Sequence, residues 1–148
     1  MPETVTARHA LPNLFVGQSQ KEITHNEALA RIDALLHPLI EAELATPPTL
    51  SVTSDDGKCW LIASGAMGLW SGKERQIARW SAGSWRFLQP VEGMALWDKN
   101  SVKRRFYIDG LWTTPAAIAD PAGGTVIDVE ARAALVAILQ HLRAARSI

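Results

Sequence analysis

The chain has 148 residues, 47% of them hydrophobic, and its fifteen Lys and Arg side chains balance fifteen Asp and Glu side chains. A chain of this length can bury one sizeable core, so we expect a single domain over residues 1–148. Balanced charge provides no general field for DNA, RNA or an anionic membrane, which argues against a nucleic-acid partner. The sequence shows neither a signal peptide nor an apolar run of about 18 residues, so we expect synthesis in the cytoplasm and no membrane insertion.

After an N-terminal arm over residues 1–18, apolar residues recur with helical spacing and predict a helix over 19–45. Pro38 can end or kink this helix near His37, because proline lacks a backbone donor. The spacing is also typical of a coiled-coil seam, over about two heptads. The apolar stripe is therefore a candidate oligomer interface, and packing against the chain's own sheet is the alternative. Its residues are His25, Leu29, Ile32, Leu36 and Leu39.

Between residues 50 and 114 the pattern changes to short aromatic or β-branched runs divided by turn residues, which is typical of an antiparallel sheet. Asp109-Gly110 is the best hairpin turn, since both central positions of such a turn favour a positive φ. The segment 81–84 is a weaker turn of the same kind. The predicted strands are 59–63, 76–80, 85–89, 94–98, 104–108 and 111–114.

Two hairpins share the motif aromatic-x-x-Gly-x-Trp, and Gly68–Trp70 repeats its second half. The glycine forms the turn and the two aromatic rings should meet across the strands. Six tryptophans exceed what a core of this size needs, so we expect some to be partly exposed and able to stack on a sugar ring. The alternative is that they hold the hairpins together from inside. The candidates for glycan stacking are Trp70, Trp80, Trp85, Tyr107 and Trp112.

Segment 115–125 contains two prolines and a Gly-Gly pair and is predicted to be a linker. The last segment, 126–148, predicts a C-terminal helix that begins near Val129, with Asp128 as its N-cap. Its many alanines would let a neighbour approach closely, and that neighbour could be another subunit. Its apolar stripe is formed by Leu135, Ile138, Leu139 and Leu142. The predicted fold class is therefore α+β, with an N-terminal helix, a central antiparallel sheet of about five to six short strands with aromatic hairpins, and a C-terminal helix.

The sequence contains no pattern that indicates a catalytic or metal site. His25 and His37 are too far apart around a helix to share a metal ion. Nucleophile elbows, phosphate-binding loops and dinucleotide fingerprints are all missing from the sequence. Asp55-Asp56 is typical of a turn, and Cys59 of a small buried hydrophobe. We therefore expect a non-enzymatic protein with no catalytic residue, no metal and no cofactor.

The basic run over residues 103–105 lies beside a predicted strand. Such runs usually form a solvated sheet edge that discourages pairing with another edge, and an anionic ligand is the alternative.

The opening residues 11–29 read Leu-Pro-x-x-x-x-Gly-Gln-x-Gln-Lys-x-x-Thr-His-Asn-Glu-Ala-Leu. This motif resembles the signature of a bacterial domain-of-unknown-function family that is encoded with phage tail, spike or gene-transfer-agent structural genes. The Trp-x-x-Gly-x-Trp-x-Phe-x-x-Pro-x-x-Gly pattern within 77–93 is similar to the same family, as are Gly68–Trp70 and 106–112. The ending 123–148, with Asp-x-Glu-Ala-Arg-Ala-Ala, resembles small particle-associated proteins.

This resemblance implies a structural or assembly component of a phage-like particle, associated with a tail, spike or fibre. The family offers no catalytic residue to transfer to this chain. We expect a homo-oligomer, with a trimer favoured, that contacts other particle proteins and ends up in a virion or phage-like particle. A carbohydrate-binding module that recognises bacterial surface polysaccharide through exposed tryptophans is the alternative.

Overall fold

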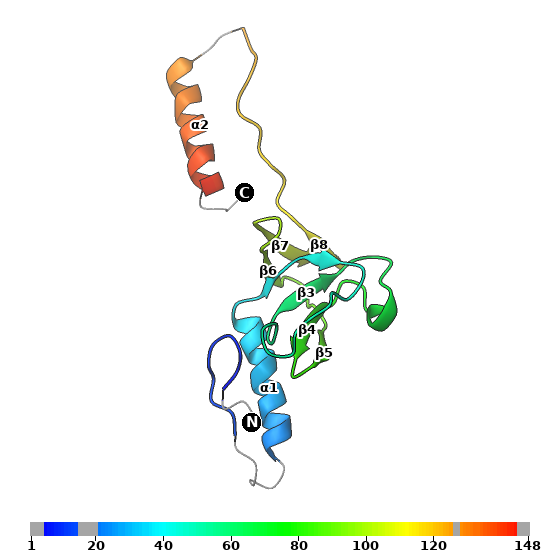
Figure 1. Cartoon of the computed structure of the whole chain (residues 1–148). Coiled ribbons are helices and arrows are strands. Elements are labelled where there is room, and N and C mark those ends of the chain that lie inside the picture. Colours follow the sequence, from blue (N-terminus) through cyan, green and yellow to red (C-terminus); the bar gives the residue numbers. More distant parts are fainter. Residues whose placement is uncertain (1–4, 15–20, 126–127, 145–148) are drawn as a thin grey trace.

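A computed structural model describes residues 5–14, 21–125 and 128–144 (Figure 1). Helix α1 comes first and helix α2 last, with eight short strands and one 3-10 turn, η1, between them. In chain order the elements are α1 (Lys21–Leu36), β1 (Leu39–Ile40), β2 (Glu43–Leu44), β3 (Cys59–Ile62), η1 (Gly68–Trp70), β4 (Ile77–Ser81), β5 (Ser84–Leu88), β6 (Ala95–Asp98), β7 (Lys103–Ile108), β8 (Leu111–Thr113) and α2 (Val129–Ala144).

The strands form two four-stranded sheets, in the orders β2-β3-β4-β5 and β1-β6-β7-β8. Each sheet is antiparallel except at one edge, where a two-residue strand pairs in parallel, β2 with β3 and β1 with β6. The predicted α+β class is confirmed. The prediction of one antiparallel sheet differs from the structure, because β1 and β2 come from a segment without strand-like alternation and each joins a different sheet.

The first helix ends earlier than predicted, at Leu36, and Leu39 lies in β1 instead of on the helical stripe; the predicted start, at residues 19 and 20, lies outside the described residues. Pro38 ends the helix, as its missing backbone donor requires. The last carbonyl groups are then satisfied from outside: the guanidinium group of Arg8 donates to the carbonyl oxygens of Ala34, His37 and Leu39. The chain leaves the helix extended, so the predicted helix over 37–45 is wrong.

All six strands predicted between residues 59 and 114 are present, with ends that differ by at most one residue. In the β4–β5 turn, φ is +49° at Ala82 and +75° at Gly83, and in the β7–β8 turn it is +50° at Asp109 and +76° at Gly110. These values suit the two-residue hairpin turn whose twist matches that of the strands. Trp80 therefore lies opposite Trp85, and Tyr107 opposite Trp112, as the shared motif predicts.

Two apolar clusters lie on opposite faces of the β2-β3-β4-β5 sheet, because neighbouring side chains of a strand point to opposite faces. One cluster joins this sheet to α1 and β6, and contains Ala34, Ile40, Cys59, Leu61, Ile77, Leu88 and Leu96. The other lies under the loops that carry η1, and contains Trp60, Ile62, Ala66, Trp70 and Ala78.

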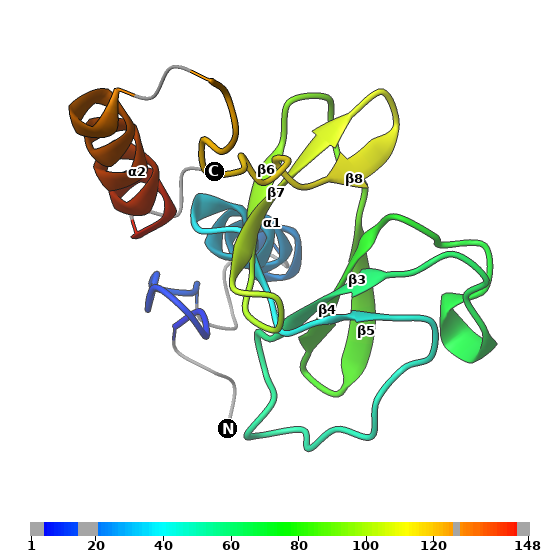
Figure 2. The same ribbon diagram turned by 90° about the horizontal axis from the view of Figure 1, so that it is seen from above.

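Helix α2 lies apart from both sheets, at the end of an extended segment over 114–125 (Figures 1 and 2). The predicted N-cap is confirmed, since the side chain of Asp128 accepts a hydrogen bond of 2.8 Å from the backbone N–H of Ala131. Arg143 near the end of the helix holds the extended segment through Asp120 and the carbonyl oxygen of Ile118. None of the helix residues is buried.

Candidate functional site

Four of the six tryptophans form one cluster on the outer face of the β2-β3-β4-β5 sheet. Trp85 is its centre, with ring centroids 5.5 Å from Trp60, 4.9 Å from Trp70 and 5.1 Å from Trp80, each in an edge-to-face arrangement. Trp70 is fully buried, so the prediction that its ring could stack on a sugar is wrong. The cause is η1, which folds this ring inward under the loops. Trp80 and Trp85 are partly buried.

The second aromatic pair lies on the β7–β8 hairpin, away from the tryptophan cluster. The ring centroids of Tyr107 and Trp112 are 5.2 Å apart. Both rings are partly buried, and Trp112 packs against the cluster beneath α1. Its indole N–H donates to the carbonyl oxygen of Arg75 at 2.8 Å, which fixes the orientation of the ring.

The predicted interface stripe of α1 faces outward. The helix buries Asp33 and Ala34 and leaves Ile32 and Leu36 about half exposed. His25 is exposed as well, and Leu29 is partly buried. The described part of the chain thus does not cover the stripe that the spacing singled out.

Asp33 holds the N-terminal arm against α1. Its carboxylate is buried and accepts hydrogen bonds from the Thr6 hydroxyl group and from the backbone N–H groups of Arg8 and His9. The ring of His9 lies 3.0 Å from the same carboxylate. Burial raises the pKa of Asp33, but the hydrogen bonds together lower it by more than burial raises it. The pKa of Asp33 therefore lies below its ordinary value. The group therefore serves as a charged anchor.

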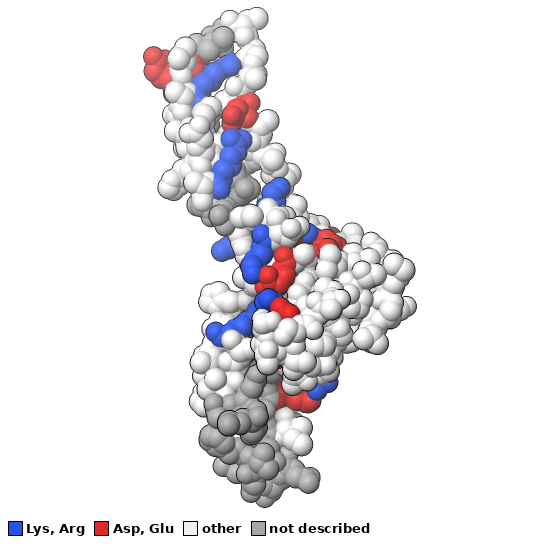
Figure 3. Space-filling model, viewed as in Figure 1, with Lys and Arg blue, Asp and Glu red and all other residues white. Residues whose placement is uncertain are grey.

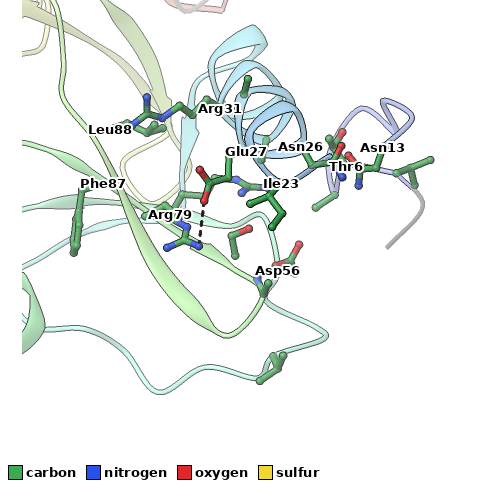
Figure 4. Close-up of a pocket in the computed structure, with 18 of the residues that line it drawn as sticks. Thr6, Asn13, Ile23, Asn26, Glu27, Arg31, Asp56, Arg79, Phe87 and Leu88 are labelled. Carbon is green, nitrogen blue, oxygen red and sulfur yellow. Dashed lines mark hydrogen bonds and ion pairs between the residues drawn. The ribbon is translucent and has the colours of Figure 1, made fainter. Parts of the chain in front are cut away.

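A groove of about 960 Å³ separates α1 from strands β4 and β5 (Figure 4). Two arginines, Arg79 and Arg86, stand directly opposite each other on its sheet side. Sequence reasoning missed them, since each is an ordinary charged residue within a strand pattern. Their equal distance along the chain from the β4–β5 turn could have revealed them, because it makes them partners across the two strands, with side chains on the same face of the sheet.

The basic run over residues 103–105 belongs to an interior strand, because β7 pairs with both β6 and β8. The prediction of a sheet edge is therefore wrong. Arg105 pairs with Asp98 at 2.6 Å and with Glu43 at 2.5 Å, which joins the two sheets. Burial raises the pKa of Asp98, and hydrogen bonds from Ser101 and Arg105 lower it below its ordinary value.

The other polar candidates have structural roles. Asp55 and Asp56 hold backbone N–H groups in turns, as predicted. Cys59 is buried, and burial raises the pKa of its thiol, which suits a small hydrophobe better than a nucleophile. Among residues 5–14, 21–125 and 128–144, no cluster of His, Cys, Asp or Glu could hold a metal ion. In the same part of the chain, neither helix is long and apolar enough to cross a membrane.

The surface is unevenly charged. In the view of Figure 3, Lys, Arg, Asp and Glu gather along α2 and the middle of the molecule, whereas the right-hand side of the molecule is mostly uncharged. Met67 and Leu69 at η1 are exposed.

These features define a small α+β domain with two mixed sheets, a buried tryptophan cluster and an uncovered helical stripe. The chain belongs to the family described as protein of unknown function (DUF2793), whose model matches residues 25–113, from α1 to the end of β8. A search of curated proteins found no match.

Proposed function

We propose that this chain is a non-enzymatic structural or assembly component of a phage-like or gene-transfer-agent particle, associated with its tail, spike or fibre. In this role the chain forms a homo-oligomer, with a trimer as the proposed form, and contacts other particle proteins. The resemblance of residues 11–29 to a family encoded with such structural genes supports the particle context.

The observation that carries the assembly role is the uncovered apolar stripe of α1. Ile32 and Leu36 are 48% and 54% exposed, and Leu35 beside them is 43% exposed. Apolar side chains in neighbouring turns of one helix form a strip that another helix can cover, with about 25 cal/mol gained per Å² of apolar surface removed from water.

Helix α2 supplies a second uncovered surface of the same kind. Leu135 and Ile138 are about half exposed, and the alanines elsewhere in the helix permit close approach. Because α2 stands apart from the sheets, it can reach another subunit without any change in the domain. Two apolar helices per chain suit a closed, symmetric assembly.

The oligomer is tested by the mass of the protein in solution. Light scattering over a wide concentration range should give the mass of a trimer of the 16.1 kDa chain. Leu36→Asp places a charge in the stripe and should shift the mass to that of the monomer, with little change in the unfolding of the sheets.

Val91→Asp is the matched control, since Val91 is an exposed apolar residue in the loop between β5 and β6 and not on either helix. This variant should keep the oligomer. A monomer at every concentration would contradict the proposal. Simultaneous loss of the oligomer and of folded structure in Leu36→Asp would place the stripe in the chain's own core.

Recognition of bacterial surface polysaccharide is a second candidate function, favoured by the partial exposure of Tyr107 and Trp112. The ring of Trp112 is held rigidly by its indole hydrogen bond, as stacking on a sugar requires. Trp112→Ala should weaken binding to host polysaccharide in a pull-down assay at a temperature at which the variant is still folded. A loss of binding that only follows loss of folding would instead assign the ring to the core.

A further inference from the structure

The groove between α1 and strands β4 and β5 presents two like charges to each other. Arg79 and Arg86 are directly opposed on antiparallel strands, so their side chains leave the sheet on the same face. Like charges in such positions repel and destabilise a sheet. An anion between the two guanidinium groups would turn this repulsion into attraction.

Arg79 is the more unusual of the two, because it is only 3% exposed. Within the described part of the chain, its Nε has no hydrogen-bond partner and its guanidinium group forms no ion pair. Arginine cannot escape this cost by losing its proton. A buried charge of this kind normally has a carboxylate, a phosphate or another acceptor beside it.

The nearby acidic side chains do not supply that partner. Glu27 lies 3.7 Å from Arg86, but both side chains are more than half exposed and such a pair contributes little. Asp56 accepts a hydrogen bond from the backbone N–H of Ala82. Asp33 directs its carboxylate oxygens toward the N-terminal arm. Figure 4 shows Arg79 and Glu27 at the space between α1 and the strands, with Asp56 near the turn at one end.

We propose that this groove binds an acidic saccharide, with the carboxylate of a uronic acid between Arg79 and Arg86. A carboxylate is planar and accepts two parallel hydrogen bonds from a guanidinium group. The groove is also much larger than a single ion needs and falls within the usual range of small-molecule sites. Glu27 and Asp56 at its margin can accept hydrogen bonds from the hydroxyl groups of a sugar ring.

This proposal goes beyond the assembly role and does not depend on it. The groove is lined by Ile23, Glu27 and Arg31 of α1, whereas the proposed subunit interface uses Leu29, Ile32 and Leu36. Binding of a saccharide and mass in solution are separate measurements, so either can fail alone.

The experiment is a titration of the full chain with sodium glucuronate. Calorimetry measures the binding, and NMR records the signals of the arginine Nε–H groups. Glucuronate should bind and should shift the Nε–H signals of Arg79 and Arg86. Neutral glucose tests the need for the carboxylate, and inorganic phosphate tests the need for the sugar. Glucose that binds as well as glucuronate, or phosphate that binds better, would overturn the proposal.

Three variants locate the site. Arg79→Met and Arg86→Gln should each weaken glucuronate binding at least tenfold, whereas Arg104→Gln, an exposed arginine on β7, should leave it unchanged. The melting temperature of Arg79→Met without ligand is a second measurement: it should stay the same or rise, since an unpaired buried charge is removed. Should Arg79→Met fail to fold, Arg86→Gln decides, because its side chain is mostly exposed. Unchanged binding in Arg86→Gln, or no binding of glucuronate to the original chain, would refute the saccharide site.

Discussion

The two sheets contain the same kind of aromatic hairpin, yet different interactions hold them in place. The β2-β3-β4-β5 sheet is covered by the tryptophan cluster, in which Trp85 contacts three other indole rings. The β1-β6-β7-β8 sheet buries Asp98, which is 1% exposed, against Arg105. One motif therefore fixes only the pairing of two rings across a turn. What surrounds the pair is decided by loops far away in the sequence.

The comparison predicts different sensitivities for the two sheets. Removal of apolar surface should damage the first sheet most, since its stability rests on the exclusion of water from large rings. Loss of charge or a change of pH should damage the second sheet most, since Arg105 pairs there with Asp98 of its own sheet and with Glu43 of the other.

Trp70→Ala should have the largest effect. The ring is fully buried among other tryptophans, and loss of such a ring costs about 3–5 kcal/mol of the free energy of unfolding. Urea denaturation followed by circular dichroism measures this change. Leu69→Ala is the neighbouring control, because its side chain is 75% exposed and should change stability by less than about 0.5 kcal/mol. Equal effects of the two substitutions would show that the cluster does not support the sheet.

Much of the central fold could be predicted from the sequence because its information is local. Turns such as Asp109-Gly110 and alternating aromatic residues determine strand pairs that are neighbours along the chain. The parallel strands β1 and β2 could not be predicted in this way. Each has two residues and exists only because a distant strand offers hydrogen bonds at its edge.

The candidate site also combines features that the local sequence reveals with features that depend on distant segments. The spacing of the α1 stripe was visible in the sequence, although its end at Leu39 was wrong because Pro38 ends the helix first. Burial of Trp70 was not visible, since it depends on how η1 folds over the sheet. The juxtaposition of Arg79 and Arg86 required the register of β4 and β5, and the lack of a partner for the Nε of Arg79 within the described residues required the whole groove.

Asp98→Asn should have the second-largest effect, a loss of about 1.5–3 kcal/mol, because hydrogen bonds to charged groups contribute amounts in this range. The amide keeps an oxygen for the backbone N–H groups of Asn100 and Ser101 but loses the charge that faces Arg105. Denaturation in urea gives the value. Asp109→Asn is the control, since Asp109 is exposed in a turn that suits asparagine. A smaller loss for Asp98→Asn than for this control would contradict the role given to the pair.

A change of pH should also distinguish the contributions of the two sheets to stability, with an effect smaller than that of the two substitutions above. Because the folded-state pKa values of Asp33 and Asp98 lie below their ordinary values, their stabilising contribution is complete above the unfolded pKa of about 4 and is lost as the pH falls through the folded pKa. The free energy of unfolding should therefore decrease with acid. The free energy of unfolding of Trp70→Ala should decrease with acid in parallel with that of the original chain. That of Asp98→Asn should decrease less steeply. Parallel curves for all three proteins would remove Asp98 from the explanation.

The smallest effect is expected where the two hairpins are most alike, at the indole N–H groups. Trp80 donates to the carbonyl oxygen of Ser51 at 3.2 Å and Trp112 to that of Arg75 at 2.8 Å. Trp80→Phe and Trp112→Phe keep an aromatic ring and remove this donor, which should cost about 0.5–1.5 kcal/mol each. Both acceptor residues are exposed, so water can replace the lost donor, and the values should fall at the lower end of that range. The melting temperatures of the two variants measure the difference. A loss above about 2 kcal/mol in Trp112→Phe alone would mean that its indole group anchors the second sheet as strongly as the buried charges do.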